Sequence, residues 1–193
     1  MSQRRRMTMY GLTNQAKLSL FAVIVLLAGV PSAPYAGIFV FTKKTNTNSK
    51  LQYQWMRTDG APPTISGEWR AGSGVNRSCE KGKGWLPNGT YSVRSHQHHL
   101  NGLIKGRVWQ LSDKYCPGPR KIKRTELFIH TEETEDNGQT CTSAPDDKYC
   151  WEGSNDYKSQ GCVKVSHRDI ASVDTLYHNR NTRLGHARTL LVR

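Results

Sequence analysis

Polar and apolar residues alternate along much of the chain, and this pattern predicts a mainly β domain. Two segments, 51–56 and 106–111, alternate with the period of two that half-buried strands show, and Gly, Pro or Asp bounds each of them. The turn Pro87-Asn88-Gly89 precedes a further short strand. The strands that we expect are 51–56, 90–93, 106–111 and 127–129, with a closing strand over 188–193.

One helix is predicted near the carboxyl end of the chain. Ser166 is suited to cap its first turn, and Asp169 follows three residues later, as in a capping box. The apolar residues that follow recur every three or four positions, which places them on one face of a helix that ends near Asn179. These apolar residues are Ile170, Val173, Leu176 and Tyr177.

The amino-terminal segment has the three parts of a secretory signal peptide. Arg4–Arg6 and Lys17 precede an uncharged apolar run over 18–30, and residues 31–36 supply a cleavage region. The run is 13 residues long, shorter than the ~20 residues that a helix needs to span a bilayer. We therefore expect residues 1–36 to be a cleaved signal and the protein to be secreted to the cell wall. An uncleaved signal that anchors the protein to the membrane is the alternative.

The remainder of the chain predicts a linker and one basic domain. Residues 37–50 are rich in Lys, Thr and Asn, which favours a mobile linker before a domain over 51–193. Without residues 1–36, 24 Lys and Arg face 15 Asp and Glu, a net charge of +9 on 157 residues. This charge suits an anionic cell-wall polymer, with simple solubilisation as the alternative. Because no dense basic block with interleaved aromatic residues occurs, we expect no nucleic-acid partner, and we expect a monomer.

Five cysteines divide into four that can pair and one that remains. An exported protein is expected to form disulfides, and four cysteines allow three pairings that the sequence alone does not separate. The simplest pairing joins Cys141 to Cys150 and Cys79 to Cys116, and each bridge would stabilise the fold by roughly 2 to 4 kcal/mol. Cys162 is then a nucleophile or an inert buried thiol, unless it takes a place in one of the bridges.

Cys162 and His130 have the sequence surroundings of a reactive pair. His130 ends the apolar segment 127–129, and Cys162 follows Gly161 on a turn that leads into another apolar stretch. Sulfur attacks as a thiolate, and a free thiol is only slightly ionised at pH 7, so a neighbouring imidazole accelerates the attack. A glycine also lets the turn bend so that the N–H groups of Gly161 and Cys162 converge on an oxyanion. We therefore favour a nucleophilic role for Cys162.

These residues resemble the catalytic domain of bacterial L,D-transpeptidases, also called the YkuD domain. The family signature is a histidine at a strand end, then Ser/Thr-His-Gly-Cys, with Arg or Asn after one further residue; here the matches are His130, residues 159–162 and Lys164. The family's Pro-x-Gly-x-Tyr/Phe turn matches residues 87–91. The resemblance covers roughly residues 50–170 and is strongest to short, secreted, disulfide-bearing members from actinomycetes. It implies a β-sandwich-like single domain with one or two short helices.

The resemblance also implies a role for each matching residue. Cys162 would be the nucleophile and His130 the general base, and the backbone carbonyl of Thr131 would orient the imidazole. The backbone amides of Gln160, Gly161 and Cys162 would form the oxyanion hole. The residues that we expect to contact the substrate are Ser159, Lys164, Arg107 and Arg124.

The implied reaction is acyl transfer on the stem peptides of peptidoglycan. The enzyme would attack the amide between the L-centred diamino acid and the terminal D-alanine of a tetrapeptide stem, release D-alanine, and pass the acyl group to an amine of another stem. Water as the acceptor would make the same enzyme a carboxypeptidase. The resemblance implies no metal and no organic cofactor, because the thioester intermediate carries the acyl group.

Three departures from the family pattern are visible. Gln160 replaces the histidine of the signature, and Lys164 replaces arginine, which keeps the charge but loses the two-pronged grip on a carboxylate. His130 and Cys162 lie 32 positions apart, about twice the usual gap, and the extra residues include two of the cysteines. We expect an insertion over 131–158 that a disulfide ties into a flap beside the acyl-binding groove.

Other histidines offer alternative functions. His96 and His98 would share one face of a strand and could hold a metal ion, but no His-Glu-x-x-His motif and no fitting carboxylate motif accompanies them, so a solvated cluster is favoured. A papain-like hydrolase needs a histidine after the cysteine, such as His178 or His186, and both, like His167, are expected at the surface. An inactive, basic wall-binding module is a further alternative.

Overall fold

The structure is a computed structural model that describes residues 35–57, 59–142, 147–178 and 186–193. Most of the predicted signal segment, residues 1–34, lies outside the described residues. Within the described ranges, no helix is long and apolar enough to cross a lipid bilayer.

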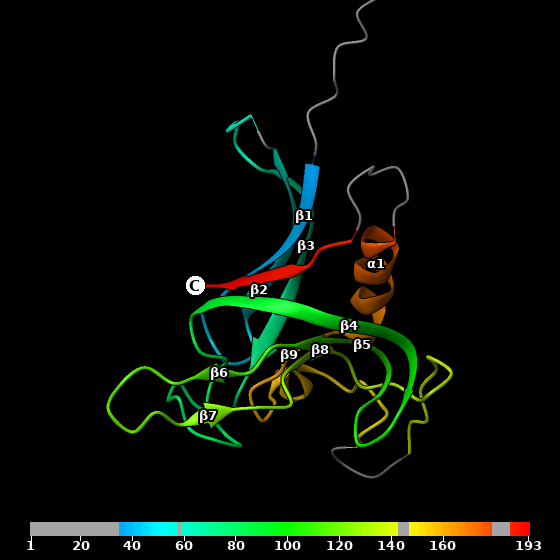
Figure 1. The fold of residues 1–193 in the computed structure, drawn as a ribbon. Helices are drawn as coiled ribbons and strands as arrows, with labels where there is room; N and C mark the ends of the chain where they lie inside the picture. Colours follow the sequence, from blue (N-terminus) through cyan, green and yellow to red (C-terminus); the bar gives the residue numbers. More distant parts are fainter. Residues whose placement is uncertain (1–34, 58, 143–146, 179–185) are drawn as a thin grey trace, which may run out of the picture. The chain divides into compact units, whose positions relative to one another are not determined.

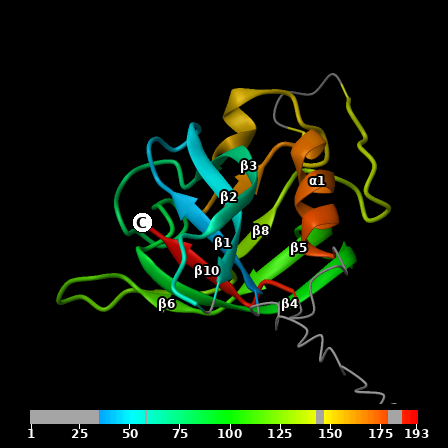
Figure 2. The same cartoon turned by 90° about the horizontal axis from the view of Figure 1, so that it is seen from above.

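Eight strands of the described residues close into a barrel, in the order β1-β10-β4-β5-β8-β9-β3-β2 (Figures 1 and 2). The mainly β class is confirmed, but the expected sandwich of two sheets is not what forms. The sheet closes because β1 pairs with β2 on one side and, in parallel, with β10 on the other. The barrel strands are β1 (Tyr35–Thr42), β2 (Ser49–Arg57), β3 (Thr64–Ser73), β4 (Gly89–Asn101), β5 (Lys105–Leu111), β8 (Phe128–His130), β9 (Val163–Val165) and β10 (Thr189–Val192). A separate two-stranded sheet joins β6 (Lys114–Tyr115) to β7 (Lys123–Arg124).

The structure corrects the predicted linker over residues 37–50. Most of that range belongs to β1 and to the start of β2, and only residues 43–48 connect the two strands. Phe39 and Phe41 are fully buried in the core, and β1 pairs with β2 along its whole length. The alternation of these aromatic side chains therefore outweighs the polar composition around them, and the folded domain begins before residue 51.

The other predicted elements are largely confirmed, with small shifts of their bounds. Strands β2, β4, β5, β8 and β10 lie where alternation and turn residues place them. The helix α1 (His167–Tyr177) is capped as expected, because the Ser166 hydroxyl accepts a hydrogen bond of 3.1 Å from the Asp169 N–H. Asn179, the predicted end of the helix, lies outside the described residues. A short 3-10 helix, η1 (Ser154–Tyr157), was not predicted.

The register of four neighbouring strands assigns their side chains to two faces of the sheet. His96 of β4, Trp109 of β5, Ile129 of β8 and Val163 of β9 form one row of successive partners. Trp109, Ile129 and Val163 are fully buried in the core, where α1 adds Ile170, Val173 and Tyr177. Because side chains alternate along a strand, the residues on either side of Ile129 and Val163 point to the opposite face.

Two disulfides brace the loops, and both match the predicted pairing. Cys79 is bonded to Cys116 with an S–S distance of 2.04 Å, and Cys141 is bonded to Cys150. Cys162 is the free cysteine of the described residues and is buried. The thiol that the sequence left unpaired is therefore available for chemistry.

Candidate active site

The parallel pairing of β8 with β9 brings His130 and Cys162 to the same face of the sheet. Ile129 lies opposite Val163 and His130 lies opposite Lys164, so Cys162, one residue before Val163, is the diagonal neighbour of His130. The spacing of strands and the rise along them put these two Cα atoms about 8 Å apart, a gap that an imidazole and a thiol side chain can bridge. This face of the sheet is opposite to the one that carries Ile129 and Val163, which point into the core.

His130 and Cys162 both line a cavity of about 530 Å³. The tip of the β4–β5 hairpin supplies an apolar wall with Leu100, Leu103 and Ile104. The segment after β8 and the disulfide-bridged segment before η1 supply other walls, so the expected insertion over 131–158 does border the cavity. The cavity is large enough to accommodate a short peptide chain.

His130 is held as a neutral base. The ring is buried, and Nδ1 lies 2.8 Å from the backbone carbonyl oxygen of Thr131. Because a carbonyl only accepts, Nδ1 carries the proton and the lone pair is on Nε2. Burial, with the Lys164 ammonium adding to its effect, lowers the pKa of His130 to about 3. The contact with Thr131 is the one that the family resemblance implies.

The Cys162 thiol is also neutral. Burial raises its pKa to about 11, and the positive charges of Lys164 and Arg124 offset this rise only in part. Sγ lies 3.6 Å from the carbonyl oxygen of Glu126, and no hydrogen bond between Sγ and the His130 ring occurs among the described residues. The site therefore holds a neutral thiol beside a neutral imidazole, and any attack by the sulfur would require proton transfer to accompany it.

Arg124 shapes the turn before Cys162. Its guanidinium is buried and donates to the carbonyl oxygens of Gln160 at 2.8 Å, Trp85 at 3.1 Å and Gly84 at 3.2 Å. Gly161 has a φ of +122°, and a Cβ atom at this position would lie 1.9 Å from Nη2 of Arg124. Arg124 was expected to contact the substrate. It does line the cavity, and three of its five N–H donors are taken by these carbonyl groups.

Ser159 has a structural role in the same turn. Its hydroxyl accepts from the N–H groups of Gly161 and Gly74 at 3.0 Å each and donates to the Cys162 carbonyl oxygen at 2.7 Å. Ser159 lines the cavity, as expected of a residue near the substrate, but all three hydrogen-bonding positions of its hydroxyl are filled within the protein. The Gly161 N–H already donates to the Ser159 hydroxyl. Of the three amides expected in the oxyanion hole, those of Gln160 and Cys162 remain as candidate donors.

The two other cations expected to bind substrate are paired with carboxylates. Arg107 forms an ion pair of 2.6 Å with Glu133, whose side chain is fully buried, and the Arg107 backbone N–H donates to the same carboxylate. Lys164 pairs with Glu132 and lies 5.7 Å from the centre of the Trp151 ring. Glu133 and Glu132 both lie just after β8, far along the chain from Arg107 and Lys164. Local sequence patterns therefore did not predict these ion pairs. Lys164 still acts on the site through its charge, as the shifts at His130 and Cys162 indicate.

Three exposed lysines that the sequence analysis did not select line the cavity, in addition to the half-buried Lys105. The three are Lys81, Lys148 and Lys158. Lys81 lies in the loop after Cys79, and Lys148 and Lys158 lie on either side of Trp151 in the sequence. Because they are not neighbours along the chain, no local motif contains all three. Their positive charge suits the carboxylates of an anionic ligand.

A disulfide and aromatic packing hold the described part of the expected insertion in place. The Cys141–Cys150 bridge precedes Trp151, whose ring meets that of Tyr157 edge to face at 4.8 Å. Tyr149 lines the cavity, and the Lys105 ammonium lies 4.6 Å from the centre of its ring. The insertion is therefore joined to the β4–β5 hairpin across the cavity. Residues 143–146 of the insertion lie outside the described residues.

No protein-family model matches this sequence, and a search of curated proteins returns no match.

Proposed function

We propose that this chain is a secreted, cysteine-dependent L,D-transpeptidase of peptidoglycan. The observation that carries the proposal is the pair formed by Cys162 and His130, which share one face of adjacent strands and open into one cavity. The free thiol and the disulfides elsewhere fit an oxidising compartment in which only one sulfur is kept for reaction. The hydrogen bond from His130 to the Thr131 carbonyl supports the assignment of a base to Nε2.

The first half of the reaction forms a thioester. The sulfur of Cys162 attacks the carbonyl carbon of the stem amide, and the thiol proton moves to Nε2 of His130 as the S–C bond forms. The amides of Gln160 and Cys162 stabilise the oxyanion. Collapse of the tetrahedral intermediate breaks the C–N bond, and D-alanine leaves with the proton from His130 on its amine.

The second half passes the acyl group to an acceptor. An amine of another stem attacks the thioester carbon and gives a proton to His130, and the C–S bond then breaks. The sulfur leaves as a thiolate and takes the proton back from His130, which restores the neutral pair. Lys164 favours this cycle because its charge stabilises the thiolate and opposes a long-lived imidazolium.

The cavity supplies two kinds of contact for a stem peptide. Lys81, Lys148 and Lys158 would attract the carboxylates of the stem, together with Arg124, which lines the same cavity. Arg107 is instead paired with Glu133. The wall with Leu100, Leu103 and Ile104 would contact the aliphatic part of the diamino acid. Because the lysines are exposed, their attraction should weaken as salt concentration rises.

The papain-like alternative finds little support in the histidines after Cys162. His178 and His186 have rings 5.2 Å apart, and the His178 ring also packs 4.7 Å from that of His96. His96 belongs to the core row of the sheet, whereas Cys162 faces away from it. We therefore keep His130 as the base.

A carbapenem tests the nucleophile directly. The purified full chain should gain the mass of one carbapenem, and peptide mapping should locate the adduct on Cys162. Cys162→Ser should gain no adduct, and His130→Ala should react about 10² to 10⁴ times more slowly. An adduct that persists in Cys162→Ser, or no adduct in the folded wild type, would contradict the proposal.

Isolated tetrapeptide stems then identify the acceptor. A cross-linked dimer with release of D-alanine would identify transpeptidation, and a tripeptide alone would identify a carboxypeptidase. If the protein reacts with neither stems nor carbapenem but binds isolated cell walls, it is an inactive wall-binding module.

A further inference from the structure

Four side chains from β4 and α1 converge on one point, away from the Cys162 site. They are His96 and His98 of β4, Asp174 of α1, and His178 directly after α1. One ligand atom of each lies within 4.8 Å of those of the others. Figures 1 and 2 both show α1 alongside β4 and β5, which is the arrangement that brings these residues together.

We propose that His96, His98, Asp174 and His178 bind one Zn²⁺ ion. The Asp174 carboxylate oxygens lie 3.1 Å from His96 Nε2, 3.3 Å from His98 Nδ1 and 3.1 Å from His178 Nδ1. Two ligand atoms that bind one zinc ion at 2.0 to 2.1 Å with tetrahedral angles lie about 3.3 Å apart. The distances from Asp174 therefore match those of a tetrahedral site, and all four ligand atoms lie within 4.8 Å of one another. Three imidazoles with one carboxylate are ligands that zinc accepts.

Two buried atoms of the cluster lack hydrogen bonds within the described residues. They are His96 Nε2 and Asp174 Oδ1, which lie 3.1 Å apart but do not meet hydrogen-bond geometry. Polar atoms that are buried without a partner are rare because they lose hydration without compensation. An ion bound between these two atoms would satisfy both of them.

The surroundings hold the His96 imidazole in place. The ring packs against those of Trp109 at 4.6 Å and Tyr177 at 5.0 Å, which fixes its orientation. His178 Nδ1 also lies 3.0 Å from the Asp174 carbonyl oxygen, which zinc binding through Nδ1 would displace. That carbonyl keeps the hydrogen bond of the His178 backbone N–H at 3.0 Å.

The site would be structural rather than catalytic. Four protein ligands fill a tetrahedral zinc ion, so no open position remains for a reacting molecule. The ion would fasten the carboxyl end of α1 to β4, while the amino end of α1 follows β9 directly. Because His96 lies on the core row and Cys162 faces the other way, zinc would support the fold without touching the thiol.

Zinc titration of the full chain tests the proposal. The protein, with both disulfides intact and after treatment with a chelator, should take up one equivalent of Zn²⁺ by isothermal titration calorimetry, and its Tm should rise. His98→Ala removes a half-exposed ligand and should weaken zinc binding by more than about 100-fold, since loss of a mere outer-shell partner costs 10- to 100-fold. Asp174→Asn, which keeps the shape of the side chain, should have the same effect.

Matched controls separate this cluster from other ligands. His99→Ala removes the adjacent imidazole outside the cluster and should leave zinc affinity unchanged, and Cys162→Ser should also bind one equivalent. Co²⁺ should give the intense visible absorption of a tetrahedral ion in wild type and none in His98→Ala. No uptake at micromolar zinc by wild type, or equal uptake by folded His98→Ala and Asp174→Asn, would overturn the proposal and identify a metal-free cluster of imidazoles around a carboxylate.

Discussion

At the scale of single residues, burial controls the protonation of Cys162 and His130. The pKa of Cys162 is raised to about 11 and that of His130 is lowered to about 3, mainly because both side chains are buried. Between these values the thiol and the imidazole are both neutral. The site thus differs from cysteine hydrolases that store a thiolate beside an imidazolium.

This protonation state predicts the pH dependence of thiol alkylation. The thiolate fraction, and with it the rate of modification of Cys162 by iodoacetamide, should rise about tenfold per pH unit from pH 7 to pH 10 and level off near pH 11. Mass spectrometry of samples quenched in acid measures the rate, and Cys162→Ser supplies the blank. A rate that is already constant from pH 5 upward would indicate a stored ion pair and contradict the expectation.

Gly161 offers a second test at this scale. Alanine there must adopt a φ of +122° and displace Arg124 from beneath the turn, so Gly161→Ala should destabilise the fold by about 1 to 3 kcal/mol. Carbapenem acylation should slow by ~10²-fold or more, because the oxyanion donors move. Urea unfolding and acylation kinetics measure the two effects.

The control for Gly161 is a glycine without those constraints. Gly153 has an extended backbone with a φ of 164°, and a Cβ atom there would meet nothing within 4 Å. Gly153→Ala should change the free energy of unfolding by no more than about 0.5 kcal/mol. Equal effects of the two substitutions would show that the Arg124 contact does not matter.

At the scale of elements, the two disulfides have different tasks. Cys79–Cys116 spans 37 residues, whereas Cys141–Cys150 spans 9 and ties the segment that carries Lys148 and Tyr149 to the cavity. A longer closed loop restricts the unfolded chain more. The first bridge should therefore contribute mainly to stability, and the second mainly to the shape of the site.

Paired serine variants test this division. Replacing Cys79 and Cys116 together should cost about 4 kcal/mol, and replacing Cys141 and Cys150 together should cost about 3 kcal/mol. The second variant should lose more affinity for tetrapeptide stems, because that bridge closes the short loop that carries Lys148 and Tyr149 to the cavity. Chemical denaturation and stem binding measure the two properties, and a loss of stem affinity confined to the first variant would reverse the assignment.

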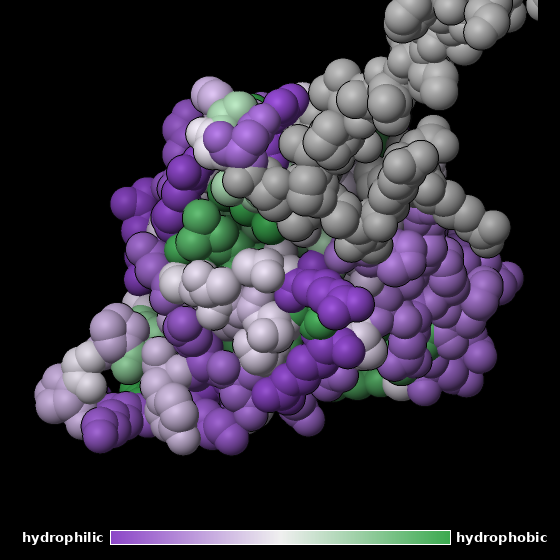
Figure 3. All heavy atoms as spheres, turned by 45° about the horizontal axis from the view of Figure 1, so that its top comes forward, coloured by the Kyte–Doolittle hydropathy of each residue, from purple (hydrophilic) through white to green (hydrophobic). Residues whose placement is uncertain are grey.

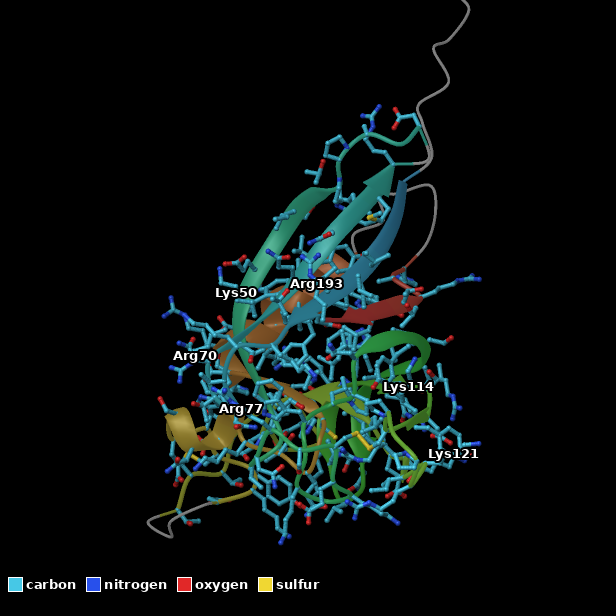
Figure 4. All side chains as sticks on the ribbon, turned by 90° about the vertical axis from the view of Figure 1, so that its left-hand side faces the viewer. Lys50, Arg70, Arg77, Lys114, Lys121 and Arg193 are labelled. Atoms are coloured by element: carbon cyan, nitrogen blue, oxygen red, sulfur yellow. A yellow bond between two sulfur atoms is a disulfide. The ribbon has the colours of Figure 1, made fainter. Side chains whose placement is uncertain are left out.

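At the scale of the whole molecule, the described surface is polar and basic. The face in Figure 3 is mostly hydrophilic, with small separate hydrophobic areas. Figure 4 shows a further side from which six labelled basic residues project. Lys50 is paired with Glu68 at 2.6 Å, whereas Arg77 and Lys121 form no ion pair among the described residues. Unpaired cations on one side suit an extended anionic polymer. The labelled residues are Lys50, Arg70, Arg77, Lys114, Lys121 and Arg193.

This surface predicts salt-dependent binding to isolated cell walls. Cys162→Ser, which cannot react, should bind walls at low salt and be released as the salt concentration rises, because exposed charges are screened. A variant with Arg77→Gln and Lys121→Gln should bind more weakly, whereas Lys50→Gln should bind like wild type because Glu68 already neutralises Lys50. Sedimentation with the walls measures binding, and retention at 1 M salt would exclude an electrostatic partner.

The sequence predicted those parts of the site that depend on neighbours along the chain. The short strand at His130 and the capped start of α1 followed from local patterns, and the disulfides that form are the simplest of the three pairings that the sequence allowed. Arg107, Arg124 and Ser159, expected to contact substrate, each also bind a partner from a distant segment that local patterns did not predict. A charged or polar side chain in a sequence shows what it can bind, but packing determines which partner reaches it first.

The sequence by itself determined that this protein is a mainly β domain with one capped helix, two disulfides and one spare thiol, because alternation, capping and cysteine counting are local or compositional signals. Tertiary structure alone decided that the sheet closes into a barrel, that His130 and Cys162 share a face, and that His96 and His98 meet Asp174 and His178. These outcomes depend on strand register and on helix docking. Both are determined by burying one common core from residues far apart in the chain, which no local pattern encodes.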